Sequence, residues 1–169
     1  MVPGATSDPS GPPALTRPRP APLASGVYNK TVTGDAQTEF CWRGDFTSTE
    51  VNALHSQAFS TRLYSDDEWD WRALVERHSL GWVVARRADE LIGFVNVVWD
   101  GFVHAWLQDE IVAVHARGSG VGTGLVRTAI DEARSAGCEW LHVDFEDDLE
   151  PFYFDACGFV PTKAGLLQL

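Results

Sequence analysis

Four alternating glycines, Gly118, Gly120, Gly122 and Gly124, lie between an apolar segment that ends near Val114 and a segment with helical periodicity. Glycine allows positive φ angles and close approach of the backbone, so several N–H groups can converge on one phosphate. The helix that follows adds the unpaired N–H groups of its first turn and the positive end of its dipole. The segment therefore predicts an anion-binding loop.

Two common phosphate-binding motifs do not fit the spacing of these glycines. The dinucleotide motif Gly-x-Gly-x-x-Gly fails because its last position holds Thr123 or Leu125, depending on which glycine starts the count. The Walker motif needs a lysine that closes the loop, and the sequence has no lysine between Lys30 and Lys163. The phosphate ligand therefore belongs to another class.

The hexapeptide 117–122, Arg-Gly-Ser-Gly-Val-Gly, matches the pattern Arg/Gln-x-x-Gly-x-Gly/Ala and resembles the acetyl-CoA loop of the GNAT acetyltransferase superfamily. The segment 152–159 resembles the second motif of that family, a tyrosine on a short helix followed by Gly-Phe. The two motifs occur in the family's order, within a resemblance that covers about residues 38–169. The resemblance implies acetyl-CoA as cosubstrate and direct acetyl transfer to an amine. No metal is expected, because His142 and Asp144 lack a third or fourth ligand nearby.

The resemblance also implies that backbone groups bind the cosubstrate. The amides of Val112 and Val114 are expected to contact the pantetheine arm, and the N–H of Val112 is expected to polarise the thioester carbonyl. The backbone from Arg117 to Gly122 is expected to hold the diphosphate. The residues expected to bind acetyl-CoA are Val112, Ala113, Val114, Arg117, Gly118, Ser119, Gly120, Val121, Gly122 and Thr123.

Tyr153 stands at the position of the family's usual general acid, and a phenol can protonate the departing thiolate. Asp109 and Glu110 are candidates for the base that takes a proton from the amine. Glu110 is slightly favoured because a carboxylate on an apolar strand is costly unless it has a use or a partner. Strand alternation is expected to place Gln108, Glu110 and Val112 on one face, and Leu107, Asp109 and Ile111 on the other.

Acceptor choice in the GNAT fold usually falls to the two early helices and their loop, here residues 62–71. Acids and aromatics interleave there, with Asp66, Asp67 and Trp69 as candidates, and such a set suits a cation that bears apolar surface. Asp144 and Glu146 are further candidates for binding an ammonium, in a region where many relatives carry asparagine. A small primary amine is the expected acceptor. The alternatives are acetylation of proteins or peptides, and an acyl-CoA sensor without catalysis.

The charge balance of the chain favours cationic partners. Of 13 basic and 24 acidic side chains, residues 1–36 hold 3 basic and 2 acidic ones, which leaves 10 basic and 22 acidic in residues 37–169. Such a field repels nucleic acid and anionic membranes and attracts amines. The expected partner is therefore a small-molecule amine, with no nucleic acid and no membrane, and the protein is expected to be a monomer or a homodimer.

Seven of the nine prolines lie in the first 22 residues, so residues 1–36 are predicted to form a disordered tail and 37–169 the acetyltransferase domain. The tail lacks the apolar core of a signal peptide, and no apolar run reaches the roughly 18 residues of a membrane span. The three cysteines show no CxxC spacing and are expected to be free thiols. A cytoplasmic location is therefore expected.

The elements that must position these residues alternate between strands and helices. Helices are expected to start at Ser48 or Thr49, at Ser65 and near Val121, with a short one at 149–157. Strands are expected at 38–43, 81–87, 91–99, 103–114, 139–146, 159–162 and 165–169. The predicted fold is α/β (α+β), a mixed, mostly antiparallel sheet of about six to seven strands flanked by helices.

Overall fold

The computed structural model describes residues 27–28 and 37–169. The predicted tail thus falls outside the described residues except for Val27–Tyr28, which form a two-residue strand paired with residues 40 and 41. In the part of the chain that is described, no helix is both long and apolar enough to cross a membrane.

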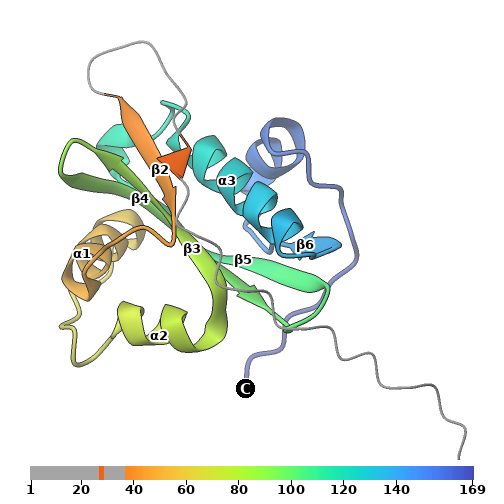
Figure 1. Ribbon diagram of the computed structural model, residues 1–169, viewed down its shortest axis with the longest axis horizontal. Coiled ribbons are helices and arrows are strands. Elements are labelled where there is room, and N and C mark those ends of the chain that lie inside the picture. Colours follow the sequence, from red (N-terminus) through yellow and green to blue (C-terminus); the bar gives the residue numbers. More distant parts are fainter. Residues whose placement is uncertain (1–26, 29–36) are drawn as a thin grey trace, which may run out of the picture.

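A six-stranded sheet forms the centre of the fold, and its strands follow one another in space in sequence order. Each neighbouring pair is antiparallel except the last, which is parallel because a helix connects its two strands. Figure 1 shows the sheet with helices packed around it. The strands are β1 (Val27–Tyr28), β2 (Thr38–Trp42), β3 (Ser79–Arg87), β4 (Glu90–Trp99), β5 (His104–Val112) and β6 (Trp140–His142).

The helices α1 (Ser48–Phe59) and α2 (Trp71–His78) cover one face of the sheet, and α3 (Val121–Ser135) covers the other. Two successive residues of β4 show this division. The ring of Phe94 contacts Trp71 of α2, whereas a β-carbon at Gly93 would touch Leu125 and Val121 of α3. β4 is therefore buried on both sides and sits at the centre of the core.

Both early helices begin at caps other than those predicted. Thr47 caps α1 through a capping box, since its hydroxyl accepts from the N–H of Glu50 while the Glu50 carboxylate accepts from the N–H of Thr47. Asp70 caps α2 by accepting from the N–H of Ala73. The backbone N–H and the hydroxyl of Ser65 instead donate to the carboxylate of Glu68 in an isolated turn. The second helix therefore starts later than predicted, at Trp71.

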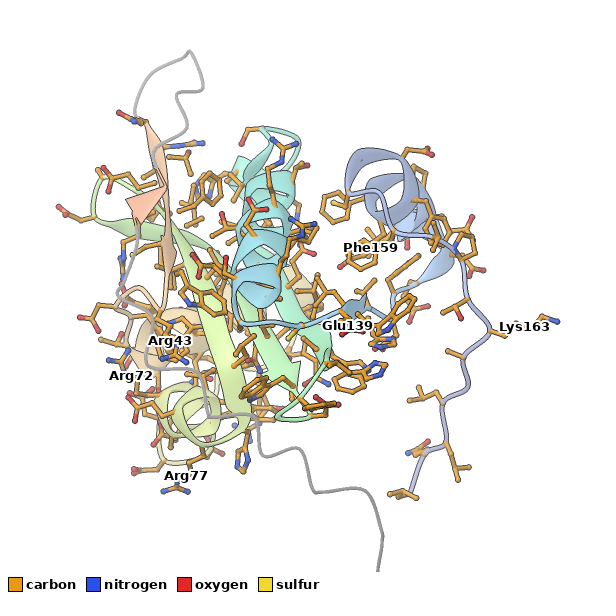
Figure 2. All side chains as sticks on the ribbon, turned by 45° about the vertical axis from the view of Figure 1, so that its right-hand side comes forward. Arg43, Arg72, Arg77, Glu139, Phe159 and Lys163 are labelled. Atoms are coloured by element: carbon orange, nitrogen blue, oxygen red, sulfur yellow. The ribbon has the colours of Figure 1, made fainter. Side chains whose placement is uncertain are left out.

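The fold class is confirmed, but β1 was not predicted and two predicted strands do not form. Five of the seven predicted strands are present, and the two predicted at 159–162 and 165–169 are not. Pro161 lacks an N–H for a strand ladder and Gly165 weakens a strand, which accounts for the difference. In Figure 2, Phe159 lies between α3 and the last helical turn, whereas Lys163 points away from the body of the protein.

Replacing Gly124 with alanine is expected to destabilise the protein by up to about 2 kcal/mol. Alanine favours a helix over glycine by about 1 kcal/mol. However, its β-carbon would lie 2.2 Å from the buried ring of Phe40, and overpacking of this kind typically costs about 1–3 kcal/mol. Urea unfolding measures the change. The double variant Gly124→Ala, Phe40→Leu should recover part of the loss, and a more stable single variant would contradict the packing.

Candidate active site

The glycine loop leaves β5 through a short 3-10 turn, Val114–Ala116, and ends at the first residue of α3. Gly118 has φ = 71° and Gly120 has φ = 84°, in the left-handed region that side chains rarely adopt. The space around both α-carbons is open, so conformation rather than crowding requires glycine there. Gly120 is the N-cap of α3 and offers no side-chain acceptor to the first turn of the helix.

The N–H groups at this end of α3 are directed outward. The first bond within the helix runs from the N–H of Gly124 to the carbonyl of Gly120, so the N–H groups of 121–123 have no partner inside the helix. The side chains of Arg117 and Ser119 are engaged with backbone carbonyls of the loop, β5 and α1. Arg117 donates to the carbonyls of Val112 and Ala58, and Ser119 donates to that of Ala116. Backbone amides are thus the groups that this loop offers to an anion.

β5 and β6 pair at only three positions, from His104↔Trp140 to Trp106↔His142. β5 continues to Val112, whereas β6 ends at His142, so the second half of β5 has no neighbour on that side among the described residues. The N–H of Ala113 donates to the carbonyl of Ile92 and points to β4. By strand alternation the N–H of Val112 points away from β4, as predicted for a pantetheine contact, whereas that of Ala113 does not.

A bulge in β5 separates the two candidate carboxylates. Phe94 pairs with Ile111 and Asn96 with Gln108, so β5 has one more residue than β4 between these pairs. Asp109 adopts φ = 52°, which aspartate tolerates better than most residues. The predicted alternation of faces is therefore wrong: Gln108 and Ile111 share one face through their partners on β4, whereas Glu110 lies on the opposite face with Leu107 and Val112.

Glu110 and Tyr153 form a hydrogen-bonded pair on the α3 face of the sheet. The Tyr153 hydroxyl donates to Oε2 of Glu110 at 2.7 Å. A β-carbon at Gly122 would lie 3.0 Å from Oε1 of Glu110, so a glycine at the start of α3 leaves room for the carboxylate. Burial raises the pKa of Glu110 to about 7, and the bond from Tyr153 partly opposes this effect.

Tyr153 sits on a π-helical turn, Pro151–Ala156, and its side chain is buried. Phe145 stacks on its ring with centroids 4.4 Å apart, and Phe152 and Phe159 pack edge to face against it. Burial, and then the charge of Glu110, raise the pKa of Tyr153 far above its ordinary value. The phenol therefore keeps its proton at neutral pH.

Asp109 faces α1 together with two polar residues that the sequence analysis did not single out. Burial raises the pKa of Asp109, while the side chain of Asn96 and the nearby His55 of α1 oppose this effect. Asn96 is fully buried, and its Nδ2 has no hydrogen bond of good geometry within the described residues. One signal could have revealed it: Asn96 interrupts the apolar run of β4.

The predicted acceptor residues do not form one cluster. Asp66 accepts hydrogen bonds from Thr49 and Asn52, so it ties the loop to α1. Trp69 is 40% exposed and lies against the rings of His55, Tyr64 and Trp71, near the face that carries Asp109. Asp67, Asp144 and Glu146 are exposed.

Lowering the pH from 8 to 5 is expected to stabilise the native protein through Glu110. Its native pKa of about 7 exceeds the ordinary 4.5, so the native state binds more protons between these values and stability falls as pH rises. The slope from one group is at most about 1.4 kcal/mol per pH unit. Urea unfolding of Glu110→Gln beside the wild type isolates the effect. The variant should gain stability relative to the wild type as pH rises, and a constant difference would contradict the shift.

No group of three or more His, Cys, Asp or Glu side chains that could hold a metal ion occurs among residues 27–28 and 37–169. The three cysteines, Cys41, Cys138 and Cys157, are free and half-buried. Burial, and then the charge of Glu110, raise the pKa of Cys157 to about 11. Its thiol therefore stays protonated and is a poor nucleophile at neutral pH.

The model of the acetyltransferase (GNAT) family matches residues 48–159, which include α1, the glycine loop and the turn that carries Tyr153. The chain therefore belongs to the GNAT acetyltransferase family, and the resemblance seen in its two motifs is confirmed. No curated protein matches the sequence significantly.

Solved structures share the fold at low identity. An acetyltransferase from Trypanosoma brucei is 20% identical, with a TM-score of 0.62 over 77% of this chain and 99% of that one. Glucosamine-6-phosphate N-acetyltransferase from Arabidopsis thaliana is 19% identical, with a TM-score of 0.63 over 77% and 97%. The complex of AAC(6')-Iy with the bisubstrate analogue CoA-S-monomethyl-acetylneamine is 17% identical, with a TM-score of 0.61 over 79% and 98%.

Proposed function

We propose that this protein transfers the acetyl group of acetyl-CoA directly to a primary amine of a small, cationic metabolite. One observation carries the proposal. The glycine loop at the start of α3 adjoins the half of β5 that β6 leaves unpaired, and Tyr153 meets that same half of β5 through Glu110. A phosphate-binding loop, an open strand and a protonated phenol together fit acetyl transfer from a CoA thioester.

In this proposal the backbone binds the cosubstrate. The N–H groups of the glycine loop and of the first turn of α3 bind the diphosphate, and the positive end of the α3 dipole adds to the attraction. The N–H of Val112 polarises the thioester carbonyl, an interaction typically worth about 3–4 kcal/mol. Tyr153 then protonates the thiolate of CoA as it departs. The open space at Gly118 and Gly120 supports this fit, because side chains there would cover the amides.

The amine needs a base, since an ammonium must lose a proton before it attacks the thioester carbonyl. Asp109 and Glu110 are the carboxylates of the open half of β5, one on each face of the sheet. Their raised pKa values bring them nearer to the pKa of an efficient base at neutral pH. Trp69 and His55 extend the face that carries Asp109, and Trp69 offers a partly exposed ring for the apolar part of a cationic acceptor.

Two measurements test the proposal. Calorimetry with acetyl-CoA tests the loop, and a thiol-release assay with a panel of amines tests transfer. The panel should include a polyamine, a lysine peptide, an aryl-alkyl amine, glucosamine and glucosamine-6-phosphate. The excess of acidic side chains favours cationic amines, so glucosamine is expected to be a better acceptor than its phosphate.

Each alternative has its own outcome in these assays. Turnover with the lysine peptide but none with small amines would replace the proposal with a protein acetyltransferase. Binding of acetyl-CoA without turnover on any amine would point to a sensor. No affinity for acetyl-CoA would reject the site itself.

The partner and location predictions belong to the same proposal. The acceptor is a small molecule rather than a nucleic acid or a membrane, and the protein acts in the cytoplasm as a monomer or a homodimer. The free cysteines support a reducing compartment.

A further inference from the structure

The bulge at Asp109 gives the two neighbouring carboxylates different surroundings. Glu110 lies on the α3 face, where its contacts are the Tyr153 hydroxyl and the start of α3. Asp109 lies on the α1 face, beside Asn96 and His55. The two acids therefore cannot both face the amine, and only Glu110 is bonded to the phenol.

We propose that Glu110 is a positioning residue for Tyr153, which holds the phenol and returns a proton to it, and that Asp109 alone faces the amine. This inference rests on the proposed acetyl transfer. It assigns to each carboxylate one of the two proton transfers that the reaction requires.

Electrostatic repulsion explains why Glu110 must carry a proton when Tyr153 acts as an acid. When Tyr153 gives its proton to the thiolate, a buried phenolate would remain 2.7 Å from the Glu110 carboxyl. Two negative charges at this distance in a buried site repel strongly. Proton transfer from Tyr153 to the thiolate is therefore unfavourable while Glu110 is ionised. A protonated Glu110 removes this obstacle by donating its own proton to the phenolate.

The proton balance of this step is simple. The hydroxyl proton of Tyr153 passes to the sulfur of CoA, and the carboxyl proton of Glu110 passes to the oxygen of Tyr153. The thiolate becomes a thiol, the tyrosine is restored, and Glu110 is left as a carboxylate. Water protonates Glu110 before the next turnover.

The other groups around the pair do not supply that proton. Asp144, which follows β6, adds a negative charge that raises the pKa of Tyr153 further. Cys157 follows the turn that carries Tyr153. Burial and the charge of Glu110 raise the pKa of its thiol, and the charge of Arg127 of α3 lowers it. Among the described residues the Tyr153 hydroxyl is hydrogen-bonded to Glu110 alone, so neither Cys157 nor Arg127 is placed to pass it a proton. Glu110 is left as the group that can both bond the phenol and titrate near neutral pH.

The experiment compares Glu110→Gln with its neighbour Asp109→Asn, since both changes replace a carboxylate with an amide of similar shape. NMR of protein labelled with ¹³C at the glutamate carboxyl carbons follows the Glu110 signal, which the glutamine variant identifies. The signal is expected to titrate near pH 7. Tyr153→Phe should move the midpoint upward, because the hydroxyl bond stabilises the carboxylate.

The kinetic arm measures kcat against pH at saturating amine. The wild type is expected to lose about tenfold in kcat per pH unit above the Glu110 midpoint. Glu110→Gln should lower kcat about 100-fold at pH 6 and lack the decline, whereas Asp109→Asn should keep the decline at the same midpoint. Near-ultraviolet circular dichroism and affinity for acetyl-CoA, unchanged in both variants, show that the fold and the loop are intact.

Three results would overturn the inference: an ordinary Glu110 midpoint near pH 4.5, a midpoint that Tyr153→Phe leaves in place, or a decline that survives in Glu110→Gln but is lost in Asp109→Asn. Failure of the proposed function looks different. If acetyl-CoA binds but no amine is acetylated, amine transfer is wrong, while a Glu110 midpoint that responds to Tyr153→Phe still supports the pairing.

Discussion

Replacing Tyr153 with phenylalanine is expected to lower kcat for acetyl transfer by about 10²–10⁴-fold, the usual contribution of a general acid. The variant keeps the ring, which packs against Phe145, Phe152 and Phe159, and loses only the hydroxyl. The thiolate of CoA would then depart without its proton donor. A thiol-release assay at saturating acetyl-CoA and amine measures the change.

Affinity for acetyl-CoA separates a chemical defect from a structural one in this variant. Calorimetry should give a dissociation constant within about threefold of the wild type, because the backbone rather than the phenol binds the cosubstrate. A kcat within about threefold of the wild type would show that another group protonates the thiolate. A large loss of affinity would mean that the change had disturbed the fold around the loop.

Replacing Gly120 with aspartate is expected to weaken the binding of acetyl-CoA at least about 100-fold. The strain of a side chain at φ = 84°, about 1–2 kcal/mol, lowers the stability of the protein rather than its affinity. The new carboxylate would also stand beside the expected diphosphate, where like charges about 4 Å apart repel by roughly 4 kcal/mol at a partly exposed site. Calorimetry measures the loss.

Gly101 provides a matched control for this variant. It has φ = 82°, nearly the same as Gly120, and the space around its α-carbon is also open. It lies in the turn between β4 and β5, away from the loop. Gly101→Asp should therefore show a similar loss of stability with unchanged affinity for acetyl-CoA. Equal losses of affinity in both variants would argue against diphosphate binding at Gly120.

The parts of the fold that were predicted correctly depend on local chemistry. The glycine loop and α3 follow from the positive φ angles that only glycine adopts readily and from a helical apolar face. The hairpin of β3 and β4 follows from two β-rich segments around a tight turn. Each of these signals lies within one short stretch of the chain.

The bulge at Asp109 could not be predicted in the same way. It arises from the register of Phe94 and Asn96 against Ile111 and Gln108, and register is a property of two strands rather than one. Alternation along β5 alone therefore gave wrong faces. His55 was missed for a similar reason, since only the packing of α1 on the sheet brings it to Asp109.

The hydrogen bond between Tyr153 and Glu110 could not be predicted from the sequence either, although both residues were predicted site residues. They are 43 positions apart, and the bond depends on how the π-helical turn packs against β5. Such a contact comes from tertiary structure, which local propensity and periodicity do not describe.

The single inserted residue in β5 has a consequence for how this protein can diverge. A shorter strand without Asp109 would pair regularly with β4 and would leave Gln108 and Glu110 on the faces that they occupy now. The insertion thus adds an acid to one side of the sheet and leaves the other side as it was. Descendants could therefore gain, lose or exchange that acid to suit new amines while inheriting the thioester machinery intact.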